Sequence, residues 1–156
     1  MRAAVVVASN RAAAGVYADE TGPLIVAWLR EQGFACDDAV VVPDGDPVRE
    51  AIRAAVAAGA RAVLTTGGTG LTPTDRTPEA TAALLDRQVP GITETIRAAG
   101  VSAGVPTAML SRGLAGVVGE CLVVNLPGSR GGVKDGLAVL EPVLRHAVEQ
   151  IVGSDH

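Results

Sequence analysis

The sequence is poor in aromatic residues and contains no run of basic residues. Only 2% of its residues are aromatic, namely Tyr17, Trp28 and Phe34, so few rings are available for stacking on the bases of single-stranded nucleic acid. The net charge is −4, and without a cluster of Lys or Arg a phosphate-backbone partner is not expected. Composition therefore argues against nucleic acid as a partner. A small anionic ligand is still compatible with it, provided that loops, single arginines or a metal ion supply local positive potential.

Cysteine and histidine are also scarce. Cys36 and Cys121 lack the spacing of a metal site, which favours two core thiols in a reducing cytosol. Neither His146 nor His156 is arranged with a serine or cysteine as in a hydrolytic triad, and no His/Cys cluster indicates zinc. The apolar run at residues 3–8 is too short for a signal peptide, and no stretch reaches membrane-spanning length. We therefore expect a cytoplasmic protein without membrane association.

The sequence is rich in small and branched apolar residues. Hydrophobic residues make up 48% of its 156 residues, which suits one domain over residues 1–156 with a core of Val, Leu, Ile and Ala. The continuous apolar run at 3–9 indicates a strand that is buried on both faces, and further strands are predicted at 37–42 and 62–66. Proline and glycine punctuation predicts helices at 23–33, 48–59, 77–87, 92–100 and 133–151.

Helix caps, a proline and a turn refine this assignment. Asp46 and Thr77 each precede a proline and are predicted to cap the helices that follow them. Pro142 should kink or split the last helix. The segment 107–126 changes character and indicates two strands joined by a turn at Gly119–Glu120. The predicted fold class is α/β, a three-layer α/β/α sandwich whose mostly parallel sheet carries one antiparallel hairpin.

Sheets of this kind bind ligands beyond the carboxyl ends of their parallel strands. Four unusual loops are expected there, at 9–11, 43–45, 65–70 and 125–128. The stretch TTGGTG at 65–70 matches neither a dinucleotide fingerprint nor a P-loop. Its glycines permit positive φ and let backbone N–H groups approach an anion, and its threonines add hydroxyl donors. We interpret it as a phosphate-binding loop, with a merely tight turn as the alternative.

Two acids lie near these loops. Asp75, in LTPTDRTPEAT, and Asp44, in PDGD, are interpreted as ligands of Mg²⁺, a hard cation that prefers carboxylate oxygen. Asp75 could instead cap a helix or pair with Arg76, and Asp44 could be an ordinary turn residue. The pair Ser111–Arg112 and the run 125–130 offer an arginine fork for phosphate and an amide for a ring edge. Solvated surface charge is the alternative for the arginines.

Three stretches taken in order resemble the MogA/MoaB family of molybdenum cofactor biosynthesis proteins. They are TTGGTGLTPTDRTPEAT (65–81), VPGITETIR (89–97) and AMLSRGLAGVVGECLVVNLPGSRGGVKDGL (108–137). The leading segment SNRAAAGVYADETGP (9–23) resembles the first-loop motif of the same family and is closer to MogA-type molybdopterin adenylyltransferases. Ala13 and Ala14 depart from the serines that many members carry there, in a loop thought to contact the pterin.

The resemblance implies a cytosolic homotrimer that transfers AMP from Mg²⁺-ATP to the terminal phosphate of molybdopterin, with release of pyrophosphate. The product would pass to a MoeA-type molybdate-insertion protein. Asp44 and Asp75 match the acids of the family motifs and are the implied catalytic and metal-binding residues. The implied substrate-binding residues are Ser9, Arg11, Gly15, Gly67, Gly68, Thr69, Gly70, Thr74, Ser111, Arg112, Asn125, Pro127, Gly128 and Ser129. A non-catalytic MoaB-like carrier is the main alternative, and a nucleotide pyrophosphatase is a weaker one.

Overall fold

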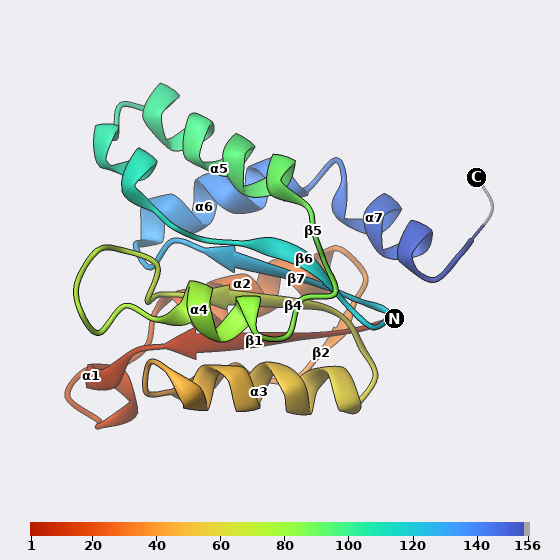
Figure 1. The fold of residues 1–156 in the computed structure, drawn as a ribbon, viewed down its shortest axis with the longest axis horizontal. Coiled ribbons are helices and arrows are strands. Elements are labelled where there is room, and N and C mark those ends of the chain that lie inside the picture. Colours follow the sequence, from red (N-terminus) through yellow and green to blue (C-terminus); the bar gives the residue numbers. More distant parts are fainter. Residues whose placement is uncertain (155–156) are drawn as a thin grey trace.

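The computed structural model describes residues 1–154, so His156 lies outside the described residues. These residues form a seven-stranded sheet with helices on both faces (Figure 1). The strands are β1 (Arg2–Ala8), β2 (Ala35–Cys36), β3 (Val40–Val42), β4 (Ala60–Thr66), β5 (Arg87–Gln88), β6 (Ala115–Val118) and β7 (Cys121–Leu126). The helices are α1 (Asn10–Ala13), α2 (Thr21–Glu31), α3 (Asp46–Ala57), α4 (Thr77–Ala82), α5 (Pro90–Ser102), the 3₁₀ helix η1 (Pro106–Leu110), α6 (Arg130–Leu140) and α7 (Leu144–Ile151).

The sheet is mostly parallel, as predicted. Its order is β2-β1-β4-β7-β6-β5, and β3 also pairs with β1. Strands β1, β2, β3, β4 and β7 run parallel, whereas β6 is antiparallel to β7 and to β5. The predicted hairpin turn is confirmed, because Val118 pairs with Cys121 and leaves Gly119, with φ +59, in the turn. The three-layer α/β/α prediction is therefore confirmed.

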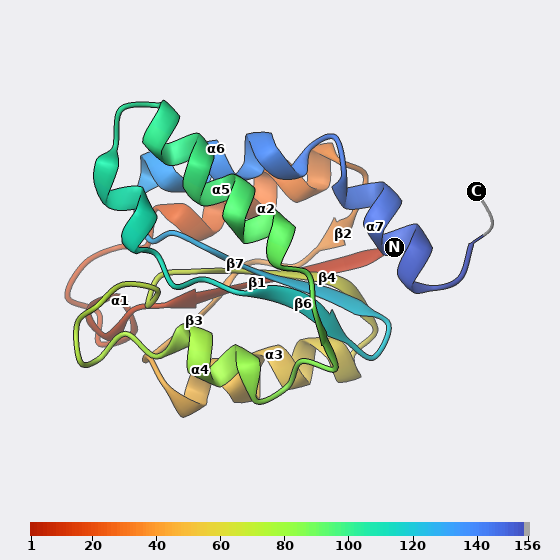
Figure 2. The ribbon, with the colours of Figure 1, turned by 45° about the horizontal axis from the view of Figure 1, so that its top comes forward.

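Each central strand contributes side chains to two separate core layers. In β1, Val5 and Val7 pack in the layer under α2 and α6, whereas Val6 and Ala8 pack in the layer under α3. Figure 2 shows α2, α5 and α6 on one side of the sheet and α3 and α4 on the other. Because neither face of the strand meets water, its sequence is a continuous apolar run and lacks polar alternation. The strand predicted at 3–9 is confirmed for that reason.

Several local predictions were wrong. Helices α3 and α4 begin at Asp46 and Thr77 themselves, with Gly45 and Arg76 at the N-cap positions, so neither predicted residue is a cap. The strand expected to begin at 107 is replaced by η1, which starts at Pro106, a residue whose fixed φ suits the first turn of a helix. The short elements α1, β2 and β5 were not predicted.

The tail is divided as Pro142 predicted, since α6 ends at Leu140 and α7 begins at Leu144. The predicted core thiols are also confirmed, because Cys36 and Cys121 are free and buried. Burial raises the pKa of the Cys121 thiol to about 12. Within residues 1–154, no helix has both the length and the apolar character that crossing a membrane would require.

Candidate functional site

Four strand-following loops lie at one edge of the sheet. The parallel register pairs Ala8 with Val42, Val7 with Thr66, and Thr66 with Leu126. Strands β1, β3, β4 and β7 therefore end side by side, and the segments that follow them emerge together. This is the arrangement that was predicted from the order of the elements, and it arises because the connections between parallel strands return each strand to the same end.

The loops that follow β1, β4 and β7 lie so close together that some of their positions require glycine. Gly67 has φ +89, and a Cβ added there would overlap the carbonyl oxygen of Ala8. A Cβ added at Gly128 would lie 3.2 Å from the Cα of Gly67. The Thr66 hydroxyl donates a 2.7 Å hydrogen bond to the carbonyl of Pro127. The loops after β1, β4 and β7 are therefore in direct contact.

Asp44 is held in place by its neighbours in the chain and across the edge. Its backbone N–H donates to Asn10 Oδ1 at 2.9 Å. Its Oδ1 accepts hydrogen bonds from the backbone N–H groups of Gly45 at 2.7 Å and Arg76 at 3.0 Å. Burial is the main cause that raises the pKa of this carboxyl, the two backbone hydrogen bonds oppose it, and the negative charge of Asp75 adds to the increase.

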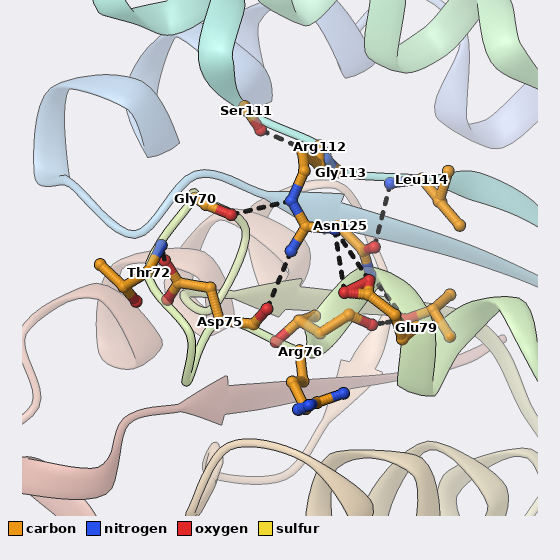
Figure 3. A network of polar contacts seen from close by, with 12 residues as sticks. Gly70, Thr72, Asp75, Arg76, Glu79, Ser111, Arg112, Gly113, Leu114 and Asn125 are labelled. Carbon is orange, nitrogen blue, oxygen red and sulfur yellow. Dashed lines mark hydrogen bonds and ion pairs between the residues drawn. The ribbon is translucent and has the colours of Figure 1, made fainter.

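The two acids face alternate glycines of one loop. A Cβ added at Gly68 would overlap Asp44 Oδ2, and a Cβ added at Gly70 would lie 2.8 Å from Asp75 Oδ2. Asp75 Oδ2 also accepts a hydrogen bond from the backbone N–H of Thr72 at 3.1 Å (Figure 3). The structure thus brings the two carboxylates to the same stretch of backbone, where side chains larger than glycine would displace them.

Arg112 ties this loop to helix α4 (Figure 3). Its Nε donates to the carbonyl of Gly70 and its Nη2 to the carbonyl of Asp75, both at 2.8 Å, and its Nη1 contacts both oxygens of Glu79 at 2.9 Å. Its backbone N–H donates to the carbonyl of Thr69 at 2.8 Å. The sequence predicted Arg112 as a phosphate ligand. In the structure its guanidinium bonds to the loop and to Glu79, which was not predicted as a site residue, and phosphate binding by Arg112 stays a prediction.

Arg112→Lys should therefore loosen the loop. An ammonium group cannot reproduce the planar fork that reaches two carbonyls and a carboxylate at once. We expect a loss of about 1–3 kcal/mol in the free energy of unfolding, the range for losing hydrogen bonds to a charged group, measured by urea denaturation. Arg53→Lys is the matched control, because Arg53 pairs with the exposed Glu50 and its substitution should change stability little. Equal effects in both variants would contradict the role given to Arg112.

Asn125, in β7, stabilises the loop region through the hydrogen bonds of its buried amide. The residue is 2% exposed. Its Oδ1 accepts from the backbone N–H of Leu114 at 3.0 Å, and its Nδ2 donates to the hydroxyls of Thr65 at 2.9 Å and Thr81 at 3.0 Å. The amide of Asn125 is thus buried and bonded on both sides, and its contact with a ligand stays a prediction.

The remaining predicted residues lie on the loop surfaces. Ser9 accepts from the backbone N–H of Ala12 at 3.2 Å and contacts the Tyr17 hydroxyl at 2.8 Å, and Arg11 stacks over the Tyr17 ring at 5.6 Å. Gly15 follows in the same exposed loop with φ +75. Tyr17 was missed as a candidate, although it stands in the segment that carried the family resemblance.

Two further serines make local hydrogen bonds, and one predicted threonine lies on the surface. Ser129 caps α6 by accepting from the backbone N–H of Gly132 at 3.1 Å, and Ser111 accepts from the backbone N–H of Gly113 at 3.3 Å. Thr74 is exposed. The capping prediction failed for α3 and α4, but a cap is present at the start of α6, in the glycine-rich run after β7.

Two cavities open on either side of the central loop, which comprises residues 67–70. The larger, of about 640 Å³, lies between the loop and helices α5 and α6, and its lining includes Gly68, Asp75, Ser111, Ser129 and Lys134. The other, of about 490 Å³, is lined by residues that include Ser9, Tyr17, Asp19, Gly67 and Arg130. Gly128 borders both cavities. Volumes in this range suit small-molecule ligands.

The donor set at this edge fits a hard cation. Among residues 1–154, no group of three or more His, Cys, Asp or Glu side chains is placed to hold a metal ion. Two carboxylates lie against the central loop, and a buried hydroxyl on the Asp44 side of it, Thr77 Oγ1, makes no hydrogen bond. Mg²⁺ is commonly held by one or two carboxylates, with water and substrate phosphates completing its shell. Asp44 and Asp75 suit that pattern and would not suit zinc.

The raised pKa of Asp44 predicts how stability should depend on pH. Because the pKa is higher in the folded chain than in the unfolded chain, ionisation of Asp44 opposes folding as pH rises through that value. Asp44→Asn keeps an acceptor for both backbone N–H groups and removes the charge. We expect this variant to be more stable than the parent at pH 7, with the difference disappearing at acidic pH, as measured by urea denaturation. A variant less stable than the parent at pH 7 would contradict the assignment.

Comparisons with known proteins place this arrangement in one family. The family model described as "Probable molybdopterin binding domain" matches residues 4–146. A molybdenum cofactor biosynthesis bifunctional protein of Synechococcus elongatus is 44% identical over 155 residues, which are 99% of this chain and 48% of that protein. This chain thus spans about half the length of that relative. A molybdopterin adenylyltransferase of Haemophilus influenzae is 39% identical over 142 residues, 88% of this chain and 71% of the relative.

A solved structure agrees closely with the fold. The structure described as an anomalous substructure of MogA has a TM-score of 0.94 and 54% sequence identity. The match covers 97% of this chain and 99% of that chain. The resemblance that the sequence motifs carried is therefore confirmed along almost the whole chain.

Proposed function

This chain belongs to the family of probable molybdopterin-binding domains, and we propose that it is a molybdopterin adenylyltransferase. The reaction would transfer AMP from ATP to the terminal phosphate of molybdopterin and release pyrophosphate. The relative from Haemophilus influenzae is named for this activity. The main support for this proposal is that the central loop 67–70 lies between two cavities and is contacted by both Asp44 and Asp75.

The two cavities supply room for two substrates that must meet. Gly128 borders both cavities, and Gly67 and Gly68 line one each. Two ligands bound on either side would therefore approach each other at the glycine loop. Backbone N–H groups of such a loop can contact phosphate oxygens closely, because no side chain intervenes. Holding both reactants in this geometry is itself a large part of catalysis for phosphoryl and nucleotidyl transfer.

Asp44 and Asp75 would hold Mg²⁺ at this loop. When bound, the cation supplies positive charge to the phosphate oxygens and to the departing pyrophosphate. The acceptor is a phosphate that is already ionised at neutral pH, so the transfer needs no general base.

Other properties of the proposal rest on the family resemblance alone. They are a homotrimeric assembly, a cytoplasmic location, and transfer of the product to a MoeA-type molybdate-insertion protein. The remaining predicted contacts, including Arg11, Gly15 and Thr74, are proposed as substrate contacts on the same basis.

The experiment that tests the function mixes purified protein with molybdopterin, ATP and Mg²⁺ and follows pyrophosphate. Release that requires all three components, with formation of adenylylated molybdopterin, supports the transferase. Tight binding of molybdopterin without pyrophosphate release would support a carrier instead. Release of pyrophosphate from ATP without molybdopterin would support a pyrophosphatase.

A further inference from the structure

Thr77 has a buried hydroxyl that makes no hydrogen bond. The residue is 0% exposed, and its Oγ1 is the one buried side-chain nitrogen or oxygen within residues 1–154 that has no partner. Leaving a buried hydroxyl unpaired costs about 1–3 kcal/mol. The hydroxyl does not cap helix α4, because α4 begins at Thr77 and has Arg76 at the N-cap position. The cost therefore calls for an explanation outside the helix.

The hydroxyl lies beside the Asp44 carboxylate. A Cβ added at Gly68 would overlap both Thr77 Oγ1 and Asp44 Oδ2, so the two oxygens lie against the same face of this glycine. The backbone N–H of Thr77 donates to the carbonyl of Gly68 at 3.0 Å, which fixes the start of α4 against the loop. The backbone N–H groups of Gly45 and Arg76 are both bonded to Asp44 Oδ1, and Asp44 Oδ2 is the oxygen that faces Gly68 and Thr77.

We propose that Thr77 is a further binding residue of this site, whose hydroxyl oxygen contacts a divalent cation, or a water of its hydration shell, together with Asp44 Oδ2. The inference rests on the cation of the proposed function. Hard divalent cations accept hydroxyl and carboxylate oxygen as ligands, and a threonine or serine hydroxyl holds Mg²⁺ beside phosphates in P-loop enzymes. A ligand of this kind gives the unpaired hydroxyl a partner when the site is filled.

The contrast between binding and stability tests this role. In Thr77→Val the side chain keeps its shape and loses the unpaired hydroxyl, so the free energy of unfolding should stay the same or rise. Mn²⁺ affinity, measured by electron paramagnetic resonance with a non-hydrolysable ATP analogue, should fall by about 10- to 100-fold, the usual cost of losing a group that supports a metal. Thr77→Ser should keep most of the parent affinity.

Thr93→Val is the matched control. Thr93 is also buried, but its hydroxyl contacts the carbonyl of Pro90 in α5, so this variant should keep the parent Mn²⁺ affinity. If Thr77→Val loses stability and binds Mn²⁺ as the parent does, the hydroxyl is structural and the inference is overturned while the proposed function stands. If the parent itself binds no Mn²⁺ in the presence of the nucleotide analogue, both the inference and the cation of the proposed function are overturned.

Discussion

Replacing Asp75 with asparagine is expected to reduce AMP transfer by about 10²- to 10³-fold, the range for removing one group that stabilises charge in the transition state. The carboxylate lies against Gly70, on the loop that also meets Asp44. Asparagine can still accept the hydrogen bond from the backbone N–H of Thr72, so the loop should keep its shape. The loss should appear in the rate of pyrophosphate release at saturating substrates, with little change in the affinity for molybdopterin.

Asp86→Asn is the control for this prediction. Asp86 likewise accepts a backbone hydrogen bond in a loop, from Gly119 at 2.7 Å, but it lies at the hairpin and lines neither of the two cavities beside the central loop. This variant should transfer AMP at the parent rate. An Asp75→Asn protein with full activity would show that Asp75 has no part in the reaction, whatever its place beside the loop.

Gly68→Ala should damage stability and activity together. Gly68 has φ +67, a conformation that costs an alanine about 1–2 kcal/mol. Its new Cβ would also overlap Asp44 Oδ2 and Thr77 Oγ1, and overpacking of this kind adds about 1–3 kcal/mol. Both oxygens would have to move away from the loop. We therefore expect a lower urea midpoint and a loss of AMP transfer that persists under conditions where the variant is fully folded.

Gly119→Ala is the control that separates the backbone strain of an alanine at positive φ from the steric overlap of its Cβ. Gly119 has a similar φ of +59, but an added Cβ would meet nothing within 4 Å. This variant should lose about 1–2 kcal/mol from backbone strain alone and keep normal AMP transfer. If both alanine variants lose stability equally and both remain active, the close approach of Gly68 to the two side-chain oxygens does not affect AMP transfer.

The sheet and its functional edge could be predicted from the sequence because the signals are local or follow from topology. The run that contains Val5, Val6 and Val7 is apolar throughout, since each strand residue enters one of two buried layers. Once several strands are parallel, their carboxyl ends must lie at one edge. The loops that carry Asp44 and Gly68 could therefore be placed together before any contact was known.

The roles of single polar side chains could not be predicted in the same way. The hydrogen-bond partners of these side chains are distant in the chain, such as Gly70 for Arg112 and Thr65 for Asn125. The Thr77 hydroxyl has no partner at all. No spacing rule in the sequence distinguishes an arginine that holds a loop from one that binds phosphate. For Thr77 the Thr–Pro pattern indicated a cap, and only the position of its hydroxyl beside Asp44 suggested another role.

We propose that Asp44 and Asp75 share one divalent cation that also carries the phosphates of the nucleotide. The most direct measurement is a crystal structure of the protein with Mn²⁺ and a non-hydrolysable ATP analogue, with the cation located by its anomalous scattering. We expect one Mn²⁺ at the loop 67–70, within bonding distance of both carboxylates and of phosphate oxygens. A nucleotide bound at this edge with Mn²⁺ absent, or held by neither Asp44 nor Asp75, would contradict it.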